Sequence, residues 1–217
     1  MKLHLGCGQR YFNGYVNIDY PLTEHSVQRN SVADEFHNLL SLRYPVASID
    51  EVRLHHVFEH FTRAQACALL ASWNSWSKPG AVLHVEVPDL GSTAKAVLSP
   101  FTSNRAKNVG LRHIFGSQEA HWAVHYEGYT KSSLVRMMDR FGYKAHSVQQ
   151  ERYKDTHNLI VIARKTTALS PTMAEAAASE HLRQYMVDQS PSEETLFAVW
   201  MDDFRRQLTN TSASGWI

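Results

Sequence analysis

The stretch Lys2-Leu3-His4-Leu5-Gly6-Cys7-Gly8 joins a short apolar run to a Gly-x-Gly turn. Such a run predicts a buried strand, and glycine lets the backbone of the following loop approach a ligand closely because it has no side chain. A second run, Tyr15-Val16-Asn17-Ile18-Asp19, ends in an acid. Strand, glycine turn, strand and acid are typical of the nucleotide-binding half of a doubly wound sheet. We therefore expect the turn to hold a phosphate or carboxylate group and Asp19 to hold two ribose hydroxyls.

The spacing between the two runs disfavours an ordinary dinucleotide oxidoreductase. Only residues 9–14 connect them, whereas a parallel crossover normally takes about a dozen residues or more. Any helix between these strands must therefore be nearly absent. Tyr11 also stands where the G-x-G-x-x-G fingerprint has its third glycine, which argues against an NAD-linked enzyme. A tight turn without a ligand is the alternative interpretation of the same residues.

The bulk composition predicts one domain with its own core. The chain has 217 residues, of which 43% are hydrophobic and 20% charged, and this is enough to bury a core with some chain left over. A net charge near +1 gives no reason to expect nucleic-acid or membrane-surface binding. The two cysteines, Cys7 and Cys67, resemble cytosolic thiols more than a disulfide framework. With no signal peptide and no apolar run near the roughly 20 residues of a membrane span, we expect a cytoplasmic protein.

The later residues predict alternating strands and helices. The apolar patterns, Thr caps and Gly stops indicate strands at 48–56, 81–87, 144–152 and 157–164, helices at 62–76 and 130–138, and helix with loop at 91–108. Residues 21–33 have no clean period and predict loop or irregular helix. Asn38-Leu39 stands where a third strand would pass into a loop, and Asp89 follows the strand at 81–87. Ligands of open α/β sheets bind at the carboxyl edge of the strands, which makes such positions candidates for a site.

An ordered series of motifs covers about residues 2–165. It runs L-H-L-G-C-G, N-I-D, S-I-D-E-V-x-x-x-H-V-F-E-H-F, K-P-G-A-V-L-H-V-E-V-P-D-L, G-S-Q-E-A-H-W-A-V-H, Y-T-K-S-S-L, R-F-G-Y and N-L-I-V-I-A-R-K. The series resembles class I S-adenosylmethionine-dependent methyltransferases of the bacterial type often associated with cell-surface polysaccharide biosynthesis. The resemblance implies an α/β, Rossmann-like sheet of seven strands, the last one antiparallel between its neighbours. It implies that residues 1–165 form the domain that binds the cofactor, S-adenosyl-L-methionine.

The resemblance also implies cofactor roles for individual residues. In such enzymes the positions matching Asp19 hold the ribose hydroxyls, and the position of His56 lies near the methyl group. Asn38 departs from the acid more usual beside the adenine amino group, although an amide oxygen can still accept that hydrogen bond. The complete set of implied cofactor-binding residues is Gly6, Cys7, Gly8, Asp19, Asn38, Leu39 and His56.

Methyl transfer to a hydroxyl needs an aligned acceptor and a base, and histidine suits that task near neutral pH. His121 and His125 are four residues apart, so on a helix they would share a face. We expect His125 to be the base, with His121 as second choice and Asp89 or His56 orienting or replacing it. A metal pair is an alternative, but no nearby acid completes a ligand set, and no metal is expected.

The aromatic residues near these histidines are candidates for the acceptor pocket, with ordinary core packing as the alternative. They are Trp122, Tyr126 and Tyr129. Among the other histidines of the thirteen in the chain, His60 is expected to be a structural hydrogen-bonding group at a helix start. Seven more are expected at surface or core positions: His4, His25, His37, His84, His146, His157 and His181.

The acceptor follows from analogy with the resembled family. A sugar or glycan hydroxyl is the leading candidate, since sugar sites often combine exposed aromatics with histidine and acids. N- or S-methylation of another small molecule is the second possibility. The third is an inactive cofactor-binding module that docks a glycan-synthesis enzyme.

Residues 166–217 predict a C-terminal helical extension. Ser170-Pro171 suits the start of a helix that reaches about Val187, and Ser190-Pro191-Ser192-Glu193 resembles a capping box for a second one. That second helix carries an apolar stripe that must be covered: Leu196, Phe197, Trp200, Met201, Phe204 and Leu208. The stripe could pack on its own chain, cover the acceptor pocket, or contact a second copy or partner enzyme. Trp216-Ile217 predicts a frayed tail.

Overall fold

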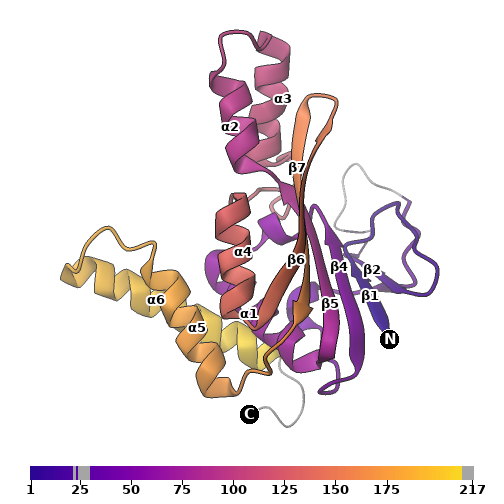
Figure 1. Cartoon of the computed structure of the whole chain (residues 1–217), viewed down its shortest axis with the longest axis vertical. Coiled ribbons are helices and arrows are strands. Elements are labelled where there is room, and N and C mark those ends of the chain that lie inside the picture. The colour runs from indigo at the N-terminus through magenta and orange to yellow at the C-terminus, as the bar shows by residue number, and fades with distance from the viewer. Residues whose placement is uncertain (22, 24–29, 212–217) are drawn as a thin grey trace.

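The computed structural model is built on one seven-stranded sheet with the order β3-β2-β1-β4-β5-β7-β6 (Figure 1). The structure describes residues 1–21, 23 and 30–211. The strands are β1 Lys2–Leu5, β2 Val16–Asp19, β3 Glu35–Phe36, β4 Ile49–His55, β5 Ser77–Pro88, β6 Tyr143–Tyr153 and β7 Thr156–Lys165. The predicted irregular segment at 21–33 falls largely outside the described residues, and so does the predicted tail at Trp216–Ile217.

The strand directions confirm the predicted Rossmann-like α/β fold. Strands β3, β2, β1, β4 and β5 pair in parallel, whereas β7 is antiparallel to both β5 and β6. The last strand therefore lies antiparallel between its neighbours, as expected. Leu3 and Leu5 of β1 and Leu54 of β4 are fully buried, which is typical of parallel strands covered on both faces. Strand β5 begins at Ser77, earlier than predicted, because Ser77 already pairs with Ile49 of β4.

The helices begin at the caps that the sequence indicates. The Thr62 hydroxyl accepts from the backbone N–H of Gln65, whose side chain in turn accepts from the N–H of Thr62. Such a capping box satisfies two backbone donors at once. Thr130 makes the same kind of box with Ser133. The helices before the extension are α1 Arg63–Trp76, α2 Leu90–Leu98, α3 Asn104–Phe115 and α4 Lys131–Arg140, with short 3-10 turns η2 Leu39–Ser41 and η3 Phe58–His60.

The C-terminal helices pack against their own chain. Helices α5 Pro171–Arg183 and α6 Pro191–Thr211 lie beside α1 (Figure 1). Most of the predicted apolar stripe lies in or against the common core: Phe197, Met201 and Phe204 are buried in it, and Trp200 and Leu208 pack against it. The Asn74 side chain of α1 donates to the carbonyl oxygens of Phe141 and Thr167 and accepts from the N–H of Leu169. These bonds fix the entry into the extension. Helix α5 ends at Arg183, before the predicted Val187.

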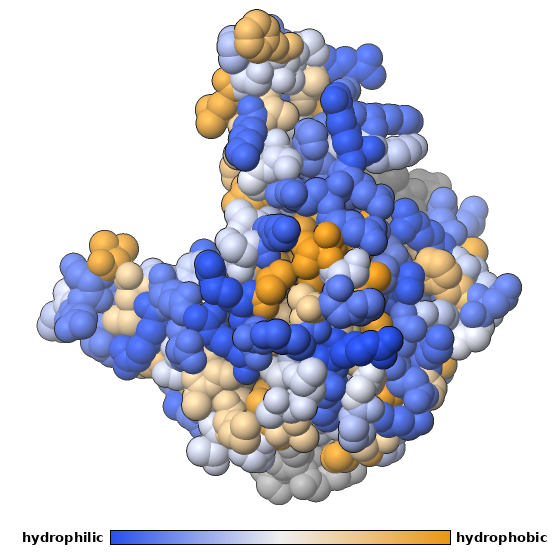
Figure 2. Space-filling view, viewed as in Figure 1, coloured by the Kyte–Doolittle hydropathy of each residue, from blue (hydrophilic) through white to orange (hydrophobic). Residues whose placement is uncertain are grey.

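Helices α2 and α3 form an antiparallel pair that projects beyond the sheet (Figure 1). Figure 2 shows hydrophobic residues on this projection, where the Leu98 and Phe101 side chains are 81% and 97% exposed. Among the residues that the structure describes, no helix has the length and apolar character needed to cross a membrane.

Candidate functional site

One large cavity opens at the carboxyl ends of β1, β2 and β4. Its volume is about 760 Å³. Its walls come from the glycine turn after β1, the end of β2, η2, the β4–η3 junction and the segment between α3 and α4. The described lining residues include Gly6, Cys7, Gly8, Asp19, Tyr20, Asn38, Leu39, His56, His60, Glu119, His121, Trp122 and Tyr126. Ten of the predicted site residues are therefore brought together at the edge where open α/β sheets bind ligands.

The glycine turn approaches its surroundings too closely for a side chain. Gly6 and Gly8 have φ angles of 68° and 56°, in the left-handed region that favours glycine. A Cβ on Gly6 would lie 2.3 Å from Cγ2 of Val57. The N–H groups of Gly6 and Cys7 both donate to the Ile18 carbonyl oxygen, at 2.8 and 3.0 Å, and tie the turn to β2. Burial raises the pKa of the Cys7 thiol to about 11, so this residue serves as a wall and not as a nucleophile.

Asp19 ends β2 with its carboxylate at the cavity. The residue is 5% exposed, and its oxygens accept from the Tyr20 N–H at 2.9 Å and the Ser31 hydroxyl at 3.2 Å. These donors fix the orientation of the carboxylate at the edge of the cavity. Asn38 lies one strand over, where its side-chain oxygen accepts from the Leu40 N–H and caps η2. The oxygen expected to accept from the adenine amino group therefore already accepts one hydrogen bond within the chain, which the sequence did not predict.

His56 is a cation held by two acids. Its Nδ1 lies 3.4 Å from Glu59 Oε1 and its Nε2 lies 3.3 Å from Glu86 Oε1. Burial by itself would lower the pKa of His56, but the two neighbouring carboxylates outweigh it and raise the pKa to about 9. A raised pKa favours the protonated ring, which cannot accept a proton, and the role of His56 as a substitute base stays a prediction.

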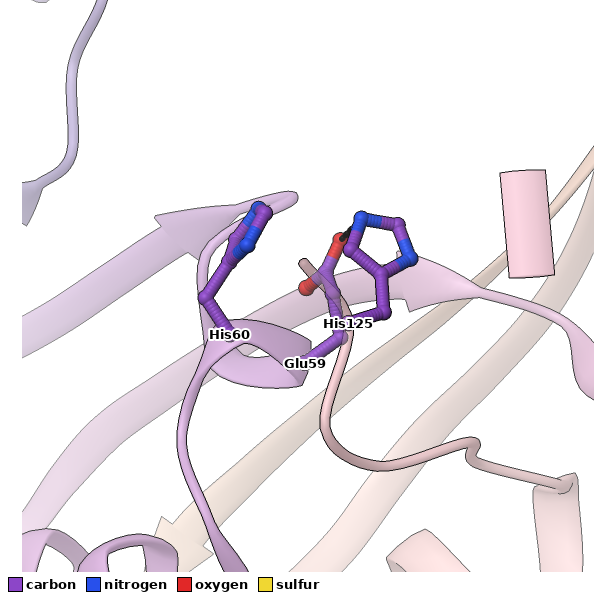
Figure 3. A group of neighbouring side chains, drawn as sticks. All are labelled: Glu59, His60 and His125. Carbon is purple, nitrogen blue, oxygen red and sulfur yellow. Dashed lines mark ion pairs between the residues drawn. The ribbon is translucent and has the colours of Figure 1, made fainter. Parts of the chain in front are cut away.

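Glu59, His60 and His125 converge beside the cavity, and Figure 3 shows the carboxylate between the two rings. One ligand atom from each lies within 4.8 Å of the others. Glu59 is 1% exposed, and the Nε2 atom of His125 lies 3.9 Å from Glu59 Oε1. The two rings meet edge to face at a centroid distance of 4.7 Å. His60 also lines the cavity, so this cluster borders the ligand space.

The segment before α4 is held by long-range backbone bonds and is not helical. Residues 116–130, all of which the structure describes, form turns, bends and isolated bridges. The N–H groups of Tyr126 and Glu127 donate to the Glu59 carbonyl oxygen, at 2.9 and 3.3 Å. The expectation that His121 and His125 could share a helix face is therefore wrong. His121 lines the cavity, whereas His125 lies behind the described lining with its Nε2 toward Glu59.

Two further predicted site residues have structural roles outside the described cavity lining. Asp89 caps α2: its carboxylate accepts from the backbone N–H of Ser92 at 3.2 Å and from the Ser92 hydroxyl at 2.6 Å. Because it directly follows β5, Asp89 lies at the carboxyl edge of the sheet, but it is not among the described residues that line the cavity. Tyr129 is 3% exposed and stacks on Phe58 at a centroid distance of 5.3 Å. This aromatic residue belongs to the core, which corrects its prediction as a pocket wall.

Glu59 is the main residue that sequence reasoning missed. Its signal was the spacing His56-x-x-Glu59-His60 directly after a strand, which we interpreted only as the lead into a helix. His60 does make the expected structural hydrogen bond, from Nδ1 to the Val124 carbonyl oxygen at 3.1 Å. It also lines the cavity, which the prediction did not include.

Comparisons with solved structures identify the fold. The chain is similar to a 1,6-didemethyltoxoflavin-N1-methyltransferase from Burkholderia thailandensis, crystallised with 1,6-didemethyltoxoflavin and S-adenosylhomocysteine. The TM-score is 0.50 at 16% identity, covering 76% of this chain and 71% of that one. It is also similar to an S-adenosylmethionine-dependent methyltransferase from Mesorhizobium loti, with a TM-score of 0.50 at 12% identity over 75% of this chain and 90% of that one. No protein-family model and no curated protein sequence matches the chain. The fold is thus the Rossmann-like fold of class I methyltransferases.

Proposed function

We propose that the protein is an S-adenosylmethionine-dependent methyltransferase that uses the cavity between the glycine turn and Asp19. The observation that carries this proposal is the glycine turn and the fixed Asp19 carboxylate on one cavity of about 760 Å³. When bound, the cofactor supplies an electrophilic methyl group on a sulfonium. The described residues fit such a nucleoside, because the glycine turn, Leu39 and the Asp19 carboxylate line one cavity and a carboxylate can accept hydrogen bonds from a diol.

The neighbouring residues complete a nucleoside site. Asp19 binds the ribose hydroxyls through charge-assisted hydrogen bonds, which are roughly twice as strong as neutral ones. Leu39 is 7% exposed at the cavity and covers one face of the adenine. Asn38 contributes its amide group beside the adenine edge. The turn at Gly6-Cys7-Gly8 holds the amino-acid part.

The acceptor we propose is a sugar or glycan hydroxyl. Trp122 and Tyr126 line the same cavity beside Glu119 and His121. Tyr126 is 53% exposed, so an apolar sugar face can stack on its ring while hydroxyls reach the polar groups. The association with polysaccharide synthesis rests on resemblance alone.

The base we propose is His121, in place of the first-choice His125, because His121 lines the cavity. Its imidazole takes the proton of the acceptor hydroxyl as the methyl group is transferred. His121→Ala should lower kcat by about 10²- to 10⁴-fold, the usual contribution of a general base. KM for the methyl donor should change little. The exposed His146 of β6 gives the matched control, and His146→Ala should keep full activity. Equal rates for His121→Ala and the parent enzyme would exclude the base assignment and favour an acceptor without a proton to remove.

The experiment that tests the function uses donor carrying a labelled methyl group. The protein is incubated with nucleotide sugars, oligosaccharides and cell extracts, and the fraction that gains label is identified by mass. Label in a carbohydrate fraction is the expected result. Label in another small molecule would exclude the glycan acceptor and keep the methyltransferase. Binding of S-adenosylhomocysteine without any turnover would favour the inactive module, and binding of NAD instead would favour an oxidoreductase.

A further inference from the structure

The cluster of Glu59, His60 and His125 presents hydrogen-bond acceptors to one point. The Nδ1 atom of His60 lies 3.1 Å from the Val124 carbonyl oxygen, and that of His125 lies 3.1 Å from the His113 carbonyl oxygen. A carbonyl oxygen can only accept, so each Nδ1 carries a hydrogen. In the neutral rings both Nε2 atoms therefore keep their lone pairs. A backbone carbonyl on the second ring nitrogen is the arrangement that metal-bound histidines usually show.

The carboxylate between the rings lacks the donors that a buried charge needs. Glu59 is 1% exposed, and neither oxygen has a hydrogen-bond partner within normal geometry among the described residues. The nearest cationic group is the His56 ring, with Nδ1 at 3.4 Å from Oε1. That ring is shared with Glu86 and makes no hydrogen bond of normal geometry to Glu59, and buried acceptors without a donor cost free energy. The Glu59 carboxylate and the two Nε2 lone pairs are all electron donors, so a cation bound between the three side chains would stabilise them.

We propose that Glu59, His60 and His125 bind one divalent transition-metal ion of the Zn²⁺ type. Two histidines and one carboxylate form a common three-ligand set for catalytic zinc, which leaves a fourth position open. Ligands about 2.1 Å from one ion lie up to about 4.2 Å apart, so side chains within 4.8 Å need to close only slightly. His60 lines the cavity, which directs the open position toward the ligand space.

The proposed metal ion would also activate the acceptor hydroxyl, and this part of the inference rests on the proposed function. With the ion bound, the open position would take an acceptor hydroxyl oxygen and would lower the pKa of that hydroxyl. The proton passes to the His121 imidazole, the O–CH₃ bond forms and the S–CH₃ bond breaks. The products are the methyl ether, neutral S-adenosylhomocysteine and protonated His121.

The test is a Co²⁺ titration of chelator-treated full-length protein, followed by visible absorption and by displacement with Zn²⁺. We expect one equivalent per chain and the strong visible bands of a four-coordinate site. Glu59→Gln, His60→Gln and His125→Gln should each weaken Co²⁺ binding by at least about 100-fold. His181→Gln is the matched control, since His181 is a buried histidine that lies in α5, outside the cluster; it should leave the affinity unchanged.

Two further measurements separate the possible failures. Zn²⁺ should raise the Tm of the parent protein and not that of Glu59→Gln, because a ligand stabilises only the state that binds it. S-adenosylhomocysteine binding by calorimetry reports whether each variant is folded and keeps its cofactor site. Parent protein that binds S-adenosylhomocysteine but no Co²⁺ would overturn the metal site alone. Protein that binds Co²⁺ but no S-adenosylhomocysteine would overturn the proposed function alone. Co²⁺ binding that survives all three substitutions would place the ion elsewhere and contradict the proposal.

Discussion

Asp19→Ala is expected to weaken S-adenosylhomocysteine binding by about 10²- to 10⁴-fold, measured by calorimetry. The reason is the loss of two hydrogen bonds from the ribose to a charged acceptor, each contributing about 1.5–3 kcal/mol. The carboxylate is nearly buried and already oriented by the Tyr20 N–H and the Ser31 hydroxyl. Because Asp19 is already ordered in the free protein, binding costs little side-chain entropy there, and removing the carboxylate does not offset the lost hydrogen bonds. Asp19→Asn, which keeps one acceptor oxygen and loses the charge, should fall between the parent and Asp19→Ala.

The control for this substitution is Asp50→Asn. Asp50 lies in β4 near its start, pairs with Lys78 and the N-terminal amine, and is not among the described residues that line the cavity. Exposed ion pairs contribute about 0–1 kcal/mol, so this variant should keep both its fold and its affinity. If Asp19→Ala binds as tightly as Asp50→Asn while remaining folded, the ribose role of Asp19 is wrong.

Gly6→Ala is the second substitution with a large expected effect. A methyl group here would lie 2.3 Å from Cγ2 of Val57, and the backbone has a φ of 68°. Left-handed backbone costs a residue with a Cβ about 1–2 kcal/mol, and overpacking adds typically 1–3 kcal/mol. We expect the free energy of unfolding to fall by about 2–5 kcal/mol in urea titrations. Cofactor affinity should be lost as well, because relief of the contact moves the turn or the β4–η3 junction.

A substitution at Gly14 separates the cost of the left-handed backbone from the cost of the contact with Val57. Its φ of 82° is also left-handed, but a Cβ there meets nothing within 4 Å. Gly14→Ala should therefore cost only the backbone share, about 1–2 kcal/mol, and keep cofactor binding. Adding Val57→Ala to Gly6→Ala should recover part of the stability. Equal losses for Gly6→Ala and Gly14→Ala would show that the close approach to Val57 has no energetic importance.

The parts of the site that follow local rules were predictable from the sequence. The glycine turn and Asp19 belong to two short runs whose order and spacing define the start of the sheet. Thr62 and Thr130 begin helices because their hydroxyls satisfy N–H groups three residues ahead. These interactions join residues close together in the sequence, so the local sequence pattern is enough to predict them.

The parts that depend on long-range contacts were not predictable in the same way. His125 lies where it does because the Glu59 carbonyl oxygen accepts from the N–H groups of Tyr126 and Glu127. The four-residue spacing of His121 and His125 gives no information about such long-range hydrogen bonds. Tyr129 is suited equally to a core and to a pocket wall, and only its stacking on Phe58 decides between them.

Asp89 illustrates a local signal given too little weight. A carboxylate at the carboxyl edge of a strand suggested a site residue, but Asp89 with Ser92 three positions later is also a helix cap. The missed Glu59 is the opposite case. Its spacing from His56 and its neighbour His60 were visible, yet the acid gained significance only when the chain brought His125 beside it.

A crystal structure of the protein with S-adenosylhomocysteine tests the central claim most directly. We predict the ribose hydroxyls on the Asp19 carboxylate, the adenine against Leu39 and the amino-acid part on the turn at Gly6-Cys7-Gly8. A nucleoside bound at another surface, or crystals that stay free of it at saturating concentration, would contradict the account.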